Sequence, residues 1–116
     1  MKTVQKTAKT LLVALMLTTT FGSALHADAI KGQKYYLKSL KNKFSMNGTQ
    51  FAGQHTQDEW EELFENRGEG FIQEYSLKYP KAEKFLQNPK SWKKLQHVRD
   101  FAVKYGSDSG NVPSCG

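Results

Sequence analysis

The strongest structural signal in the sequence is the segment Thr56-Gln57-Asp58-Glu59-Trp60-Glu61-Glu62-Leu63-Phe64. The Thr56 hydroxyl can accept a hydrogen bond from the Glu59 amide, and the Glu59 carboxylate can reach back to the Thr56 amide, which is the capping-box pattern of a helix start. Further acidic residues follow in the first turns, where the helix dipole favours negative charge. The segment therefore predicts a helix that begins after Thr56 and ends by Gly68. Its buried stripe consists of Trp60, Leu63 and Phe64.

Upstream of this helix, the stretch from about Asp28 to Asn42 has a helical period. Its apolar residues recur every three or four positions, and lysines occupy the other faces. The segment Ser45-Met46-Asn47-Gly48-Thr49 then favours a turn, because Asn-Gly readily takes positive φ. The apolar stripe of this first stretch consists of Ile30, Leu37, Leu40 and Phe44, with Tyr36 beside it.

Two more helices and a short helical turn are expected downstream. A stretch from Phe71 to Tyr79 ends at Pro80, because proline lacks an amide hydrogen and restricts the residue before it. A short turn of helix follows over residues 81–87. The last helix begins at Asn88-Pro89, since proline is favoured at the first helical position, and Gly106 lies where a left-handed residue commonly ends a helix. The apolar residues are Phe71, Ile72, Tyr75 and Leu77 in the first of these, and Trp92, Leu95, Val98, Phe101, Ala102 and Tyr105 in the last.

The first 27 residues have the order of features found in a signal peptide. Three lysines precede the wholly apolar run of residues 11–17, and small residues follow it. Cleavage is expected near Ala27, and Ala24 or Ala29 would also suit the peptidase. An uncleaved membrane anchor is the alternative, but a spanning helix needs about 20 mostly apolar residues. The sequence therefore predicts a periplasmic protein without stable membrane insertion after processing.

The charge balance changes once the leader is removed. The full chain has 17 basic and 11 acidic residues, for a net charge of +6. The leader holds three lysines and no acid, so residues 28–116 have 14 basic and 11 acidic residues, for a net charge of +3. The signs are interspersed, as on an ordinary solvated surface. Nucleic-acid binding would need clustered basic residues, and we exclude it as a function.

Residues 28–116 form one small all-α domain followed by a flexible tail over residues 106–116. Domains of this size bury limited surface and often add a disulfide, a metal or a cofactor. The single cysteine, Cys115, excludes an internal disulfide. An odd cysteine in an exported protein indicates an intermolecular bond or a reactive thiol. A disulfide-linked dimer or partner through Cys115 is therefore one hypothesis, and an unused thiol on the tail is the other.

Motifs for catalysis or metal binding are not present in the sequence. It has no nucleophile elbow, no phosphate-binding glycine loop and no His-Glu-x-x-His helix. His55 and His97 are the only histidines after the leader, and they show no ligand spacing with Met46 or Cys115. We therefore expect a non-enzymatic protein without a metal site.

The helix containing Gly32-Gln33-Lys34-Tyr35-Tyr36-Leu37-Lys38-Ser39 matches the opening of a known family. That opening has a glycine, a few residues, an aromatic and three residues before Cys-x-x-Cys-His. From about Asp28 to Tyr105 the chain resembles a small class I c-type cytochrome domain, and residues 56–60 are similar to its capped middle helix. The resemblance implies an orthogonal packing of about four helices.

In that family the first helix packs across the last one through small and aromatic residues. The resemblance therefore implies that Gly32 and Tyr36 face Phe101 and Tyr105. It also implies a function in electron transfer, because members of the family carry haem.

The attachment motif itself is missing. The chain has Leu40-Lys41-Asn42-Lys43-Phe44 where Cys-x-x-Cys-His would stand. Two thioether bonds need two cysteines, and the iron needs the histidine. Covalent haem attachment here is therefore excluded. Met46 follows too closely to match the distal methionine of the family.

Three interpretations remain open. In the first, the domain lacks haem and is an auxiliary or partner-binding protein linked to periplasmic electron transfer, with aromatic side chains in the haem space. In the second, it carries haem noncovalently, with His55 and His97 as candidate axial ligands. In the third, it is an unrelated exported helical module that binds a partner or the envelope. The aromatic residues of the first interpretation are Phe44, Phe51, Trp60 and Phe64.

Overall fold

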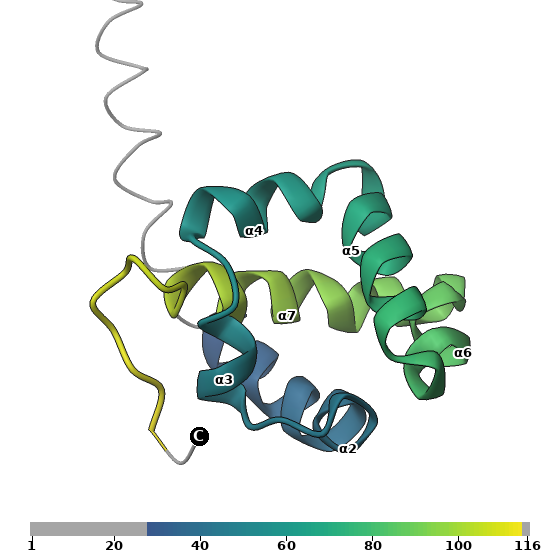
Figure 1. The fold of residues 1–116 in the computed structure, drawn as a ribbon, viewed down its shortest axis with the longest axis horizontal. Coiled ribbons are helices and arrows are strands. Elements are labelled where there is room, and N and C mark those ends of the chain that lie inside the picture. Colours follow the sequence, from purple (N-terminus) through teal and green to yellow (C-terminus); the bar gives the residue numbers. More distant parts are fainter. Residues whose placement is uncertain (1–27, 115–116) are drawn as a thin grey trace, which may run out of the picture.

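The computed structural model describes residues 28–114, and all regular secondary structure in that range is helical (Figure 1). The all-α class is therefore confirmed. None of the described helices is long and apolar enough to cross a membrane. After an α-helical start over residues 28–35, the elements are η1 (Tyr36–Leu40), α2 (Lys41–Phe44), α3 (Gly48–Ala52), α4 (Gln57–Leu63), α5 (Glu65–Lys78), η2 (Pro80–Ala82), α6 (Glu83–Gln87), η3 (Pro89–Ser91) and α7 (Trp92–Lys104).

The N-terminal helix runs unbroken from residue 28 to Phe44, two residues beyond its predicted end. Its middle, η1, is a π-helical turn in which the Lys41 amide donates to the Tyr36 carbonyl. The wider turn spaces the buried residues Tyr36, Leu40 and Phe44 four positions apart. Tyr36 is therefore fully buried, whereas Ile30, which was predicted in the stripe, is 48% exposed.

The segment predicted as an Asn-Gly turn instead begins a helix. Asn47 has a φ of −75°, and the left-handed residue is Ser45, with a φ of 56°. The Asn47 side chain accepts from the Gln50 amide at 2.8 Å, and the Gln50 side chain accepts from the Asn47 amide at 3.0 Å. This capping box starts α3, which the sequence prediction missed.

Helix α4 begins at the predicted capping box. The Glu59 amide donates to the Thr56 hydroxyl at 3.2 Å, and the Thr56 amide donates to the Glu59 carboxylate at 2.8 Å. The hydrogen bond from the Thr56 amide lowers the pKa of Glu59. The helix ends at Leu63, before the predicted limit at Gly68.

The second half of the chain follows most of the predicted boundaries. Pro80 ends α5, and α6 is the expected short helix. In α7 the predicted stripe is buried at Leu95, Val98, Phe101 and Ala102. The prediction was wrong at the start of α5, which is Glu65 rather than Phe71, and also at Leu77 and Gly106. Leu77 is 83% exposed. Gly106 is not among the residues with positive φ, and a Cβ there would lie 2.9 Å from the Gln57 amide nitrogen.

Helix α7 lies between α4 on one side and α3 on the other (Figure 1). Helix α4 runs along it, and the N-terminal helix crosses it in direct backbone contact. A Cβ on Gly32 would lie 1.8 Å from the His97 carbonyl oxygen and 2.8 Å from the Phe101 Cβ. The Tyr36 and Phe101 rings are 6.1 Å apart. Of the expected contacts, that of Gly32 and Tyr36 with Phe101 is therefore present, whereas the Tyr105 ring packs on Phe101 itself, with centroids 5.3 Å apart.

The segment after α7 is held by hydrogen bonds to two helices and a loop. The Ser107 amide donates to the His55 carbonyl at 2.9 Å, and Asp108 accepts from the Gln57 amide at 2.8 Å. The Gln33 side chain donates to the Ser114 carbonyl at 2.7 Å. The expected signal peptide, residues 1–27, and Cys115, the candidate for an intermolecular disulfide, both lie outside the described residues.

Candidate functional site

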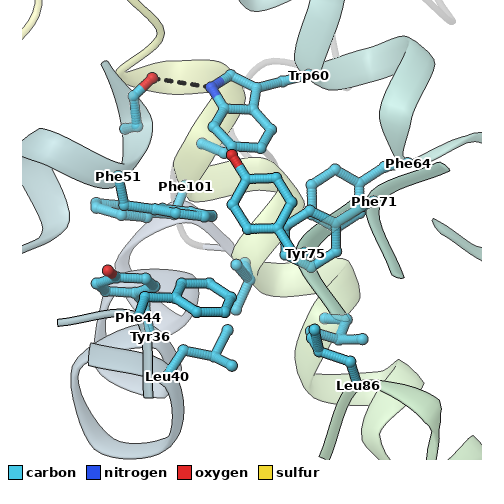
Figure 2. Packing of buried hydrophobic residues seen from close by; sticks show 14 of the residues in the cluster. Tyr36, Leu40, Phe44, Phe51, Trp60, Phe64, Phe71, Tyr75, Leu86 and Phe101 are labelled. Carbon is cyan, nitrogen blue, oxygen red and sulfur yellow. Dashed lines mark hydrogen bonds between the residues drawn. The ribbon is translucent and has the colours of Figure 1, made fainter. Parts of the chain in front are cut away.

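The interior is filled by one hydrophobic cluster, and aromatic side chains are its largest members (Figure 2). Phe51 stacks on Tyr36 with ring centroids 4.4 Å apart, and Phe64 stacks on Phe71 at the same distance. Trp60 contacts both stacks, because its ring centroid is 4.9 Å from that of Phe51 and 6.1 Å from that of Phe64. All members of the aromatic cluster are at most 3% exposed: Tyr36, Phe44, Phe51, Trp60, Phe64, Phe71 and Tyr75.

The polar atoms of this aromatic cluster have partners at its edge. The Trp60 indole donates to the Ala52 carbonyl at 2.8 Å, and the Tyr36 hydroxyl donates to the Met46 carbonyl at 2.7 Å. The Tyr75 hydroxyl donates to the Gln54 side chain at 2.5 Å. Burial raises the pKa of both tyrosines, so they stay protonated donors. The aromatic cluster thus consists of packed side chains whose own polar atoms are hydrogen-bonded.

His55 lies in the loop before α4, between two carboxylates. Its Nε2 is 3.5 Å from a Glu74 oxygen, and its Nδ1 is 3.9 Å from a Glu59 oxygen. Its ring packs edge-on against Trp60, with centroids 4.8 Å apart. His55 therefore connects the start of α4 to α5 at the rim of the aromatic cluster.

His97 lies on α7 in a different cluster, facing the start of the N-terminal helix. Its Nδ1 is 3.4 Å from a carboxylate oxygen of Asp28, and its ring is 5.7 Å from that of Tyr35. The structure thus places the two candidate haem ligands beside different carboxylates. Their ligation of haem stays a prediction.

An open depression of about 530 Å³ lies where α5 begins beside the start of α7. The Arg67 guanidinium lies over the Trp92 ring, 5.5 Å from its centroid. Within residues 28–114, no carboxylate lies within ion-pair distance of Arg67, Lys90 or Lys93. We call this region the Arg67–Trp92 depression, and its lining consists of Arg67, Pro89, Lys90, Trp92, Lys93 and Gln96.

A left-handed turn builds this depression. Asn66, Arg67 and Gly68 have φ values of 52°, 58° and 72°, and the Gly68 amide donates to the Phe64 carbonyl at 3.1 Å. A Cβ on Gly68 would lie 2.9 Å from the Trp92 ring, so only glycine lets the two segments approach this closely. An arginine in this conformation is strained by roughly 1 kcal/mol, and such residues are frequent at binding sites.

Sequence reasoning missed the Arg67–Trp92 depression. Residues 66–68 were interpreted as the end of a helix, and Trp92 as a core residue, although it is only half-buried. The signal that was present is Asn-Arg-Gly, in which asparagine and glycine tolerate positive φ.

Comparisons of the chain with protein-family models, curated proteins and solved structures give no match.

Proposed function

We propose that this protein is an exported, haem-free helical domain of cytochrome c-like architecture that binds an acidic protein partner in periplasmic electron transfer. The closed aromatic cluster carries this proposal. Its rings occupy the interior, and they include the four residues expected in the haem space. The direct crossing of the N-terminal helix and α7 at Gly32 supports the architecture. A domain with a filled interior acts through its surface.

The Arg67–Trp92 depression is the surface best suited to that role. Tryptophan and arginine are enriched among the residues that dominate binding energy at protein interfaces. Its cations have no carboxylate partner among the described residues, so an acidic segment can pair with them without displacing an internal ion pair. Complementary charge also accelerates association. The partner we propose is therefore an acidic surface of a redox protein.

Haem titration tests the haem-free part of the proposal. Ferric haem added to the purified protein is expected to give the spectrum of free haem, because the aromatic cluster leaves no slot for a porphyrin. His55→Ala and His97→Ala should give the same spectrum as the unaltered protein. A shifted Soret band that disappears in His55→Ala would contradict the proposal and support a noncovalent haem carrier.

Partner binding is tested with a soluble, acidic c-type cytochrome as the probe. We expect calorimetry to show binding that weakens with added salt. The double variant Arg67→Gln/Lys93→Gln should bind at least about tenfold more weakly, corresponding to about 1.4 kcal/mol. The control is Lys81→Gln/Lys84→Gln, which removes the same charge from exposed lysines of η2 and α6 outside the depression. Equal losses in both double variants would contradict the assigned surface.

A further inference from the structure

Three potential metal ligands meet where the N-terminal helix begins against α7. Asp28 lies in the first turn of that helix, and His97 and Asp100 lie one turn apart on α7. One ligand atom from each side chain can be chosen so that all three lie within 4.8 Å of one another. Because 69 positions separate Asp28 from His97, only the fold brings these side chains together.

The spacing of Asp28 and His97 within this trio fits a shared ion better than a hydrogen bond. The His97 Nδ1 and the Asp28 Oδ1 are 3.4 Å apart, whereas a charge-assisted hydrogen bond would measure about 2.7–2.9 Å. Two ligand atoms that each bind a tetrahedral ion at about 2.0 Å lie about 3.3 Å from each other. The His97 Nδ1 is also shielded from solvent and has no hydrogen-bond partner. This atom therefore has an unused lone pair or proton beside two carboxylates.

The surrounding residues hold the ligands in place. The Asp100 side chain is 10% exposed, and the Arg99 Nη2 lies 3.1 Å from its Oδ1, which leaves Oδ2 available. A divalent cation would offset the repulsion between the neighbouring carboxylates of Asp28 and Asp100. Tyr35 packs on the His97 ring and restricts its rotation.

We propose that Asp28, His97 and Asp100 form a binding site for a divalent transition-metal ion, and that the bound ion fastens the start of the N-terminal helix to α7. One imidazole with two carboxylates suits Zn²⁺, which takes nitrogen and oxygen ligands in tetrahedral sites. Three protein ligands leave one position for water. This site is separate from the Arg67–Trp92 depression and does not depend on the proposed function.

Calorimetric titration of the full chain with ZnCl₂, after treatment with EDTA, tests the proposal. We expect one equivalent of Zn²⁺ to bind. His97→Ala and Asp100→Asn should each weaken binding by more than about tenfold, since even residues that only support metal ligands have effects of that size. His55→Ala is the matched control, because it removes the other imidazole that lies between two carboxylates, and it should bind Zn²⁺ as the unaltered chain does.

A second measurement separates ligation from folding. Asp28→Asn changes one atom of a side chain in the first turn of a helix, away from the aromatic cluster. Zn²⁺ should raise the unfolding temperature of the unaltered chain and of His55→Ala, but not that of Asp28→Asn. Undiminished Zn²⁺ binding by both His97→Ala and Asp28→Asn would overturn the proposal. Loss of binding in His55→Ala or Cys115→Ser alone would also overturn it, because the metal would then lie elsewhere.

Discussion

The variant Gly32→Ala is expected to lose at least about 3 kcal/mol of unfolding free energy, the upper end of the usual range for overpacked sites. The added Cβ would lie 1.8 Å from the His97 carbonyl oxygen and 2.5 Å from the His97 carbonyl carbon. Both are main-chain atoms of α7, so no side-chain rotation can relieve the contact. The helices must separate, and the gain of about 1 kcal/mol in helix propensity does not compensate. Urea unfolding followed by circular dichroism measures the loss.

Gly70→Ala is the matched control for this substitution. Gly70 lies within α5, and a Cβ there would meet its nearest neighbours, atoms of Leu63, at 3.4 to 3.6 Å, which is ordinary packing distance. Alanine should therefore stabilise the protein by up to about 1 kcal/mol through helix propensity. If both variants were as stable as the unaltered protein, the close crossing of the N-terminal helix and α7 would be contradicted.

The sequence predicted those elements whose boundaries depend on local chemistry. The capping box at Thr56, the stop at Pro80 and the start at Asn88-Pro89 involve residues a few positions apart, and all three were confirmed. Helix α3 was missed because Asn-Gly is compatible with both a turn and a helix start. Gln50, three residues after Asn47, was the signal that favours the helix.

Features set by tertiary packing were not predictable in the same way. The π turn places Tyr36 and Leu40 toward the core, and it arises where the N-terminal helix packs on its neighbours. A straight α-helical period assigned Leu40 to the core correctly, but it placed Tyr36 only beside the stripe and included the exposed Ile30. The same limit applies to the sites. Asp28 and His97 are distant in sequence, and the position of Arg67 over Trp92 depends on three consecutive left-handed residues.

Trp60→Ala is expected to destabilise the protein by about 3–5 kcal/mol, the usual cost of truncating a buried tryptophan. Trp60 is fully buried, and its ring centroid lies 6.1 Å from that of Phe64 and 6.2 Å from that of Phe71. The substitution also leaves the Ala52 carbonyl without its indole donor. Denaturant unfolding monitored by far-ultraviolet circular dichroism gives the loss without depending on tryptophan fluorescence.

The control is Trp92→Ala, which truncates the same residue type at the half-buried edge of the Arg67–Trp92 depression and should cost much less. Indole provides a sharper distinction, because apolar cavities left by truncation bind small aromatic molecules. Added indole should raise the unfolding temperature of Trp60→Ala by filling the space beside Phe51, and should leave the unaltered protein unchanged. Indole binding to the unaltered protein at this position would show that the aromatic cluster is open. An open cluster could not explain the exclusion of haem.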